Sequence, residues 1–544
     1  MPATLTLTLN STQTPIIGQV LYLTATSSAA NWDNTDNTNP LTITGPANCA
    51  LDYVLVNTSS QCLVCVYTGD SNPGTITITI TDTVNSCSAT ISVSGTIAKR
   101  AATGVTWYVQ GGIPNPAAPL LTVTGAGGST TYLYQIIALN AKGKTRGMTA
   151  ALVNLGNIPA DTTFDTVATI QQYNGQRISV INNAPDALNG TNYVVLTWPA
   201  IAGATGYDVI RSTNGSTWVS LATNQSGTTF NDQGGSTSAY TLPSANNTST
   251  GSNSNAGTSA GAAFATLAKA MSVASAGDQV IVAGFVCDTA AVACVDRVNI
   301  VGTDRFSSRC YADLAASNTS HAAYRMPSYA DVSEISFECD IFNQPIIGAL
   351  TADSPTIDCH LYGVRAAGNT NSFRFSVAGC SAYCADCLFT STHGTFGMTG
   401  SFLYSTVNMD RCTMYARGSF QTSGGGTIAM ICNQGFLCCR DTRLISNIDS
   451  QNAPSWRSYA IIAGGQSARL INVELFGVSA ELASNTPNNL ILNNTVIDPV
   501  KNSLASATGI TSINAGVYQV PPLLAGTAST AKGNSVSLTG GFNQ

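Results

Sequence analysis

Acidic side chains recur at matching positions of seven short segments in the C-terminal half of the chain. The segments are ECDIF (338–342), DCHLY (358–362), DCLFT (386–390), RCTMY (411–415), DTRLI (441–445), NVELF (472–476) and NTVID (494–498). In the first six, the first position is Glu338, Asp358, Asp386, Arg411, Asp441 and Asn472, and the third is Asp340, His360, Leu388, Thr413, Arg443 and Glu474. Only 9% of the residues are charged and only three are histidine, so this alignment gathers much of the chain's ionisable chemistry on one face.

Paired carboxylates at this spacing predict acid–base chemistry. If the segments are adjacent strands of one sheet, their carboxylates lie about 5 Å apart, which is the separation that retaining glycosidases use. Crowding raises the pKa of one member, as a general acid requires. The candidate catalytic residues are Glu338, Asp358 and Asp386, and the candidate glycan-binding residues are Asp340, His360, Arg411, Asp441 and Arg443. Two alternatives stay open: a solvated polar face in which Arg411 and Arg443 pair with Asp386 and Asp441, or a cation site.

The second and fourth positions of the same segments are small or apolar. The second column reads Cys339, Cys359, Cys387, Cys412, Thr442, Val473 and Thr495, and the fourth reads Ile341, Leu361, Phe389, Met414, Leu444, Leu475 and Ile497. Alternate side chains of a strand point the same way, so these columns predict inward stacks of a parallel β-helix whose coils vary in length. The cysteines are then small buried residues, with redox or metal roles as the alternative.

A short helix is expected before the first coil. Phe264, Leu267, Met271 and Ala274 recur at helical spacing and precede the strand QVIVAG. This stretch, GAAFATLAKAMSVASAGDQVIVAGF (261–285), resembles the N-terminal cap of right-handed, pectate-lyase-like parallel β-helices. The resemblance implies a β-helix over residues 262–500 with its first coil covered by the capping helix.

Alternating apolar and polar residues fill the N-terminal half. The strands TLTLTLN, TITITIT and ATISVSG, separated by turn-rich clusters, predict an immunoglobulin-like β-sandwich over residues 1–98. Residues 99–243 also read as strands, and the stretches 130–145 and 193–218 resemble the fibronectin type III family. That resemblance makes Trp198 the core tryptophan and Tyr207 the tyrosine of the next strand. A polar linker is expected over 244–261, and a capping or assembly segment over 501–544.

Composition excludes several classes of protein. The net charge is −6 and the first basic residue is Lys99, so the N-terminal region has no electrostatic footprint for nucleic acid. No apolar run is long enough to span a bilayer, and MPATLTLTLN does not read as a signal peptide. The cysteines Cys49, Cys62, Cys65 and Cys87 leave open structural zinc, one disulfide or buried thiols. We predict no cofactor, no metal and no membrane insertion.

The expected fold class is therefore all-β, with two N-terminal sandwiches followed by a right-handed parallel β-helix. This arrangement resembles bacteriophage tail spikes and tail fibres. The resemblance implies a structural virion appendage, made in the host cytoplasm and forming a homotrimer, whose partners are other virion proteins and a host-surface glycan or receptor. Two other functions stay open: a polysaccharide-depolymerising hydrolase or lyase, and a cellular surface adhesin or filament subunit.

Overall fold

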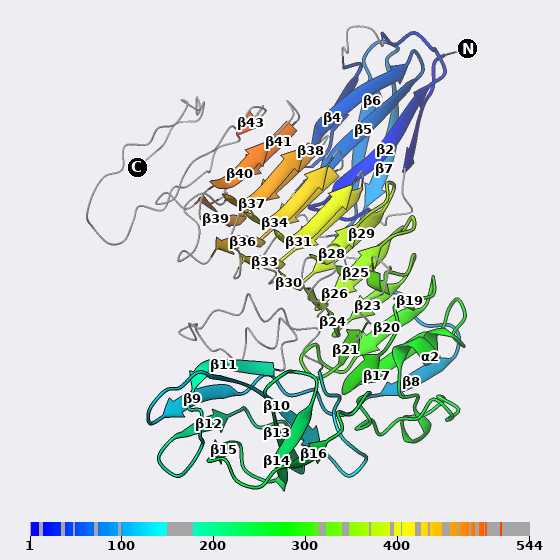
Figure 1. Ribbon diagram of the computed structural model, residues 1–544. Helices are drawn as coiled ribbons and strands as arrows, with labels where there is room; N and C mark the ends of the chain where they lie inside the picture. The colour runs from blue at the N-terminus through cyan, green and yellow to red at the C-terminus, as the bar shows by residue number, and fades with distance from the viewer. Residues whose placement is uncertain are drawn as a thin grey trace, which may run out of the picture.

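The described residues of the computed structural model form seven β-sheets and only two helical segments, so the chain is nearly all-β as predicted (Figure 1). The N-terminal sheets are antiparallel and a parallel β-helix follows them. The structure describes residues 2–513 except 10–14, 34–38, 47–48, 70–73, 96–98, 149–177, 313, 315–321, 340–347, 369–370, 392–395, 404, 419–425, 434–435, 449–456, 465–466, 478–479, 485–488, 494–495 and 498–511. Asp340 and nearly all of the predicted assembly segment 501–544 lie outside the described residues.

The first sandwich follows from the alternation in its sequence. In TITITIT the isoleucines Ile76, Ile78 and Ile80 are buried, whereas the intervening threonines face away from the core. One sheet has the order β1–β2–β5–β4 (Leu5–Leu9, Val20–Ser27, Gln61–Thr68, Cys49–Thr58). The other has the order β3–β6–β7 (Leu41–Thr44, Ile76–Asp82, Cys87–Val93).

The second sandwich contains the predicted aromatic pair. Trp198 and Tyr207 are buried with their rings 5.6 Å apart, and the Ile201 N–H donates to the Tyr207 hydroxyl at 2.9 Å. One sheet has the order β11–β10–β13–β14–β16 (Ile178–Ala184, Thr130–Leu139, Gly206–Ser212, Trp218–Gln225, Ser238–Tyr240). The other has the order β15–β12–β9 (Thr229–Asp232, Tyr193–Thr197, Leu120–Thr124).

The second sandwich is inserted between two strands of the β-helix. Strand β8 (Thr106–Gln110) pairs in parallel with β17 (Gln279–Ala283), although residues 106–110 fall in the predicted second domain. Part of the predicted linker also packs at this junction. The Gly251 N–H donates to the Gln110 carbonyl at 3.2 Å, and Thr248 is fully buried. The β-helix therefore begins before the second sandwich in the sequence.

Three parallel sheets form the β-helix. The first sheet contains β8, β17, β20 (Asn299–Gly302), β23 (Asp331–Ser333), β26 (Cys359–Tyr362), β29 (Ser381–Ala385), β32 (Thr406–Asp410), β35 (Phe436–Arg440), β38 (Ser467–Ile471), β41 (Asn489–Asn493) and β43 (Ser512–Ile513). The second contains β18 (Phe285–Asp288), β21 (Arg309–Ala312), β24 (Ser336–Cys339), β27 (Arg365–Gly368), β30 (Leu388–Ser391), β33 (Thr413–Gly418), β36 (Arg443–Ile448), β39 (Glu474–Gly477) and β42 (Val496–Ile497). The third contains β19 (Val292–Ala293), β22 (Ala322–Arg325), β25 (Gly348–Ala352), β28 (Asn371–Phe375), β31 (Phe396–Leu403), β34 (Gly426–Asn433), β37 (Arg457–Gly464) and β40 (Ala480–Ser484).

The predicted cap is present. The 3₁₀ turn η2 (Ala260–Ala262) leads into helix α2 (Leu267–Met271), where Thr266 accepts from the Lys269 N–H as the N-cap. Phe264, Leu267 and Met271 are buried and belong to the same core as the inward residues of the coils. Among the described residues, no helix combines the length and the apolar character that a membrane span needs.

The predicted strand register is correct from residue 386 onward and wrong before it. Phe389, Met414, Leu444 and Leu475 form one continuous buried column of the second sheet, and Leu475 pairs with Ile497 in the next strand. The segment at 358–362 instead belongs to the first sheet, where Leu361 pairs with Val332 and Cys384. The segment at 338–342 begins inside β24, where Glu338 pairs with Ala367.

This error has a structural cause in the corners between sheets. In most described coils the chain enters the first or the second sheet through one residue with a left-handed backbone. At several of these corners, as at Asp358 and Asp386, a small buried residue, an outward residue and a large inward residue follow. At the entry to the second sheet the corner residues with positive φ are Glu334, Gly363, Asp386, Arg411, Asp441 and Asn472, and at the entry to the first they are Gly277, Arg297, Tyr329, Asp358 and Gly379. Asp and Asn tolerate this conformation better than most residues, so both corners produce the same sequence pattern.

The cysteines are thiols in the described structure, and most of them are buried. Cys62 and Cys65 are buried, Cys49 and Cys87 are half-buried, and Cys359, Cys384, Cys387 and Cys412 are buried inside the β-helix. Burial raises the pKa of Cys359, Cys387 and Cys412 well above the ordinary thiol range, so these sulfurs stay protonated. The Cys384/Cys387 pair thus contributes to packing.

The first sandwich lies against the outer face of the first β-helix sheet, next to its later strands (Figure 1). Val20 exchanges hydrogen bonds with the Asn408 side chain at 3.1 and 3.4 Å, and the Arg469 guanidinium lies 3.9 Å from the Tyr67 ring centroid. Ile16 packs with Tyr383. The outward residues of this sheet are therefore covered by the N-terminal domain.

We predict that Asp288→Asn removes a pH-dependent loss of stability. Asp288 is buried at the cap and accepts from the Ala268 N–H (3.0 Å) and the Tyr324 hydroxyl (3.1 Å), and burial raises its pKa to about 6. Because the folded protein holds this proton to a higher pH than the unfolded chain, its stabilising effect is present below about pH 4 and is lost as the pH rises through about 6. The free energy of unfolding decreases by about 3 kcal/mol as a result.

Thermal unfolding midpoints between pH 4 and 7 check this expectation. The difference between the variant and the wild type should increase across this range. The exposed carboxylate of Asp304, replaced in Asp304→Asn, is the control. A parallel pH dependence in all three proteins would contradict the prediction.

Candidate functional site

The structure does not bring the three predicted catalytic residues together. Glu338 is on the second sheet, Asp358 is at the entry to the first sheet, and Asp386 is at the corner between the two. The prediction placed their carboxylates about 5 Å apart on successive strands, which required one register for all seven segments. The two kinds of corner make that register impossible.

Glu338 is buried between two arginines. Arg309 binds both carboxylate oxygens at 2.9 and 2.6 Å, and Arg365 donates to Oε1 at 2.7 Å. Burial by itself would raise the pKa of this carboxyl, but the two guanidinium groups outweigh it and hold the pKa below its usual value. Glu338 therefore stays ionised, whereas a general acid must hold a proton.

Asp358 and His360 belong to a buried charge cluster around Arg100. Arg100 donates to Asp331 at 2.6 Å and to Asp358 at 2.5 Å, and His360 contacts the same carboxylates at 3.3 and 2.9 Å. Burial disfavours the imidazolium, but the hydrogen bonds to Asp331 and Asp358 raise the His360 pKa overall. The cluster connects the segment after the first sandwich to strands β23 and β26, so it joins two parts of the fold.

The remaining predicted residues form a surface ladder of ion pairs. Arg411 binds Asp386 at 2.9 and 3.0 Å and also the buried Asp410 at 2.6 Å. Arg440 contacts Asp410 at 3.2 Å and Asp441 at 4.0 Å. Arg443 pairs with Glu474 at 2.6 Å, whereas the polar-face interpretation had assigned it to Asp441. Asp386 and Arg411 are about half exposed, at 55% and 52%. Such pairs contribute little stability individually.

A cleft lies between the first coils and the second sandwich. Its volume is about 420 Å³. The second sheet contributes Phe285, Arg309, Tyr311 and Glu338, and the loop before β21 contributes Phe306. Opposite them are Pro114, Pro116, Ala117 and residues 199–202, from the loops after β8 and β12.

Aromatic rings and a fixed ion pair give this cleft its chemistry. Phe306 is 61% exposed, the Phe285 and Tyr311 rings are 5.4 Å apart, and the Arg309 guanidinium lies 5.2 Å from the Phe285 ring centroid. Aromatic faces pack on the C–H surfaces of sugars, and a guanidinium–carboxylate pair supplies fixed groups for hydroxyls. The arrangement can bind a polar ring compound without performing proton transfer.

Except for Glu338, the sequence analysis missed the residues of this cleft. Phe306 stands in the polar loop sequence TDRFSS, where an aromatic residue has no core to enter, and this was the available signal. Arg309 gave no signal because its partner, Glu338, lies one coil later in the sequence. Among the described residues, no group of three or more His, Cys, Asp or Glu side chains has the geometry of a metal site.

We predict that Arg100→Gln destabilises the protein by about 3 kcal/mol, because it leaves Asp331 and Asp358 buried without their cation. Arg443→Gln is the matched control, since it removes the same charge from the half-exposed pair with Glu474 and should cost under about 1 kcal/mol. Chemical denaturation of the full chain measures both. Equal losses would show that the Arg100 cluster is no more important than a surface pair.

No family model matches the chain, and no curated protein matches it. A solved structure that does match is the pectin methylesterase from Aspergillus niger in a penultimately deglycosylated form. The match has 10% sequence identity and a TM-score of 0.35, and it covers 48% of this chain and 90% of that one. The assignment of the β-helix rests on the strand pairing described above.

Proposed function

We propose that this chain is a structural attachment protein that binds a cell-surface glycan in the cleft between its β-helix and its second sandwich. The cleft carries this proposal: the exposed Phe306 and the largely buried Phe285 and Tyr311 line it together with the Arg309–Glu338 pair. Ligand sites commonly form at such domain junctions, with apolar walls and a few fixed polar groups.

The electrostatics favour binding over cleavage. A retaining glycosidase needs one carboxyl that keeps its proton and a second about 5 Å away. In the cleft, Glu338 has a lowered pKa and both of its oxygens are occupied by arginines. The proposal therefore keeps the glycan interaction and gives the carboxylate a positioning role.

Phe306→Ala should lower glycan affinity about tenfold, the loss expected for one exposed aromatic stacking surface. Val84→Ala is the matched control, because Val84 is a similarly exposed apolar residue, at 54%, on the first sandwich. Binding of the purified full chain to capsular, lipopolysaccharide and pectin-type glycans measures the effect. Unchanged binding by the Phe306 variant would place the glycan elsewhere.

Incubation of the purified full chain with the same glycans tests the second candidate function, a polysaccharide-depolymerising hydrolase or lyase. New reducing ends or unsaturated products that disappear in Glu338→Gln would establish catalysis in the cleft. Product formation that survives in Glu338→Gln but disappears in Asp386→Asn would assign catalysis to the exposed corner ladder. Binding without product supports the attachment function.

We further propose that the attachment protein is a virion appendage that assembles as a homotrimer. The resemblance to tail spikes supports this, as does a composition poor in charge and rich in Ser, Thr, Asn and Gly strand and turn residues. Sedimentation of the purified protein should give three times the chain mass of 56.1 kDa. Antibody labelling should detect it on the surface of phage particles. A monomer absent from particles would favour the cellular adhesin.

A further inference from the structure

One column of outward side chains on the first β-helix sheet holds the first sandwich. Strand pairing places six residues of this column side by side on neighbouring strands: Asp331, His360, Tyr383, Asn408, Cys438 and Arg469. The last four contact the first sandwich, through Ile16, Val20, the Gly18 carbonyl and Tyr67 respectively. His360 is the one residue of the column whose ordinary pKa lies near neutrality.

His360 is buried at the end of this contact, with its side chain 2% exposed. Its Nδ1 lies 3.3 Å from the Asp331 carboxylate, and its Nε2 lies 2.9 Å from the Asp358 carboxylate. The ring packs edge-on against Tyr362 and Tyr383, with centroids 6.2 and 6.0 Å away. His360 thus adjoins both the buried carboxylates and the tyrosine that packs on the first sandwich.

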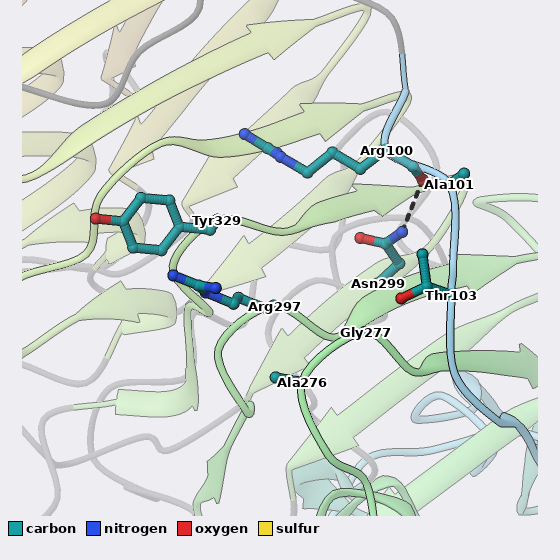
Figure 2. A pocket seen from close by; sticks show the side chains of 8 residues that line it. All are labelled: Arg100, Ala101, Thr103, Ala276, Gly277, Arg297, Asn299 and Tyr329. Atoms are coloured by element: carbon teal, nitrogen blue, oxygen red, sulfur yellow. Dashed lines mark hydrogen bonds between the residues drawn. The ribbon is translucent and has the colours of Figure 1, made fainter.

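The chain arriving from the first sandwich covers His360 with two cations. Arg100 binds both carboxylates, and its guanidinium nitrogens lie 3.2 and 3.4 Å from the two ring nitrogens of His360. The Lys99 ammonium lies 5.1 Å from the Tyr362 ring centroid. Figure 2 shows Arg100 at the edge of a pocket of about 390 Å³, where its carbonyl accepts from Asn299 and its side chain extends away from that anchor.

The protonation state of His360 changes how strongly Arg100 is held. When the imidazole is neutral, Arg100 is the cation between two carboxylates, and the ring has a single N–H to donate. When the ring is protonated, two cations share the two carboxylates, and Arg100 lies beside a like charge at close range. The cluster therefore attracts Arg100 less strongly after His360 takes up a proton.

The influences on His360 divide between the β-helix and the docked segment. Burial and the charge of Arg100 lower the pKa of His360, whereas Asp331 and Asp358 raise it, and the carboxylates prevail. Both carboxylates belong to the β-helix and stay beside His360 if the segment comes away, whereas the guanidinium and its cover leave. Undocking therefore raises the pKa further, so proton binding favours the undocked state.

The sign of this effect differs from that for global unfolding. Relative to the unfolded chain the pKa of His360 is raised, so its proton stabilises the β-helix below the ordinary value of 6.5. Relative to the undocked state the pKa is lowered, so the same proton weakens docking. Because the docked pKa already lies above 6.5, docking strengthens as the pH rises above 6.5 and is weakest below it.

We infer that His360 is a pH-controlled latch for the first sandwich, in which protonation of the imidazole loosens Arg100 and the contact between the sandwich and the β-helix. The latch is closed in mildly alkaline solution and opens as the pH falls. The inference does not depend on glycan binding in the cleft.

Limited trypsin digestion of the folded full chain tests the latch. Lys99 and Arg100 are the first basic residues, so cleavage there releases the first sandwich in one piece. Cleavage of a folded protein follows the population of its open form. Each rate is divided by that of His360→Gln at the same pH, which cancels the pH dependence of trypsin.

The wild-type ratio should rise about fivefold between pH 8.5 and pH 6.0. His393→Gln, which removes another of the three histidines, is the matched control and should behave as the wild type does. A ratio that stays constant or falls toward acid would overturn the inference.

NMR titration of the histidine rings tests the same coupling without replacing His360. The His360 signal is assigned by removing His321 and His393 in turn. Coupling between two sites is reciprocal, so Arg100→Gln should raise the titration midpoint of His360, whereas Arg443→Gln should leave it unchanged. An unchanged or lowered midpoint in Arg100→Gln would show that Arg100 and the proton do not compete.

Discussion

In most of the described coils, one residue adopts a left-handed backbone conformation where the chain turns into the first or the second sheet of the β-helix. This requirement fixes where Asp358, Asp386, Asp441 and Asn472 stand, because short polar side chains tolerate the conformation. Most residues that look like a catalytic column in the sequence are thus present for the turn.

Several of the few charged side chains lie where separate parts of the fold meet. Arg100 bridges Asp331 and Asp358, and the Arg309–Glu338–Arg365 group joins three successive strands of the second sheet. Buried charges are tolerated only when they are paired, so these groups specify how segments distant in the sequence come together. The same pairing occupies the carboxylates with guanidinium groups and lowers the pKa of Asp331 and Glu338, so neither of these two is suited to act as a general acid.

The modular order of the chain creates the two pockets. Inserting the second sandwich between β8 and β17 places its loops opposite the first coils, which forms the aromatic cleft. The segment that leads from the first sandwich into β8 passes over the corner of the first sheet and lines a second pocket there. Neither site is formed by a single contiguous element, and this is typical of sites at domain junctions.

The sequence by itself determined the all-β class, the N-terminal strands, the Trp198–Tyr207 core pair, the cap around Phe264 and the inward column from Phe389 to Leu475. The Trp198–Tyr207 pair came from the resemblance to the fibronectin type III family. The other features follow from local periodicity, since burial on one face imposes alternation on the residues that form it. Only the tertiary structure decided the register of the earlier coils and the partners of Glu338 and Asp358. The two kinds of corner have the same local sequence pattern. Which strand lies beside a given residue also depends on the lengths of the loops between strands, and these lengths are unequal. Partners such as Arg100 and Asp358 are far apart in the sequence, so no local pattern specifies their contact.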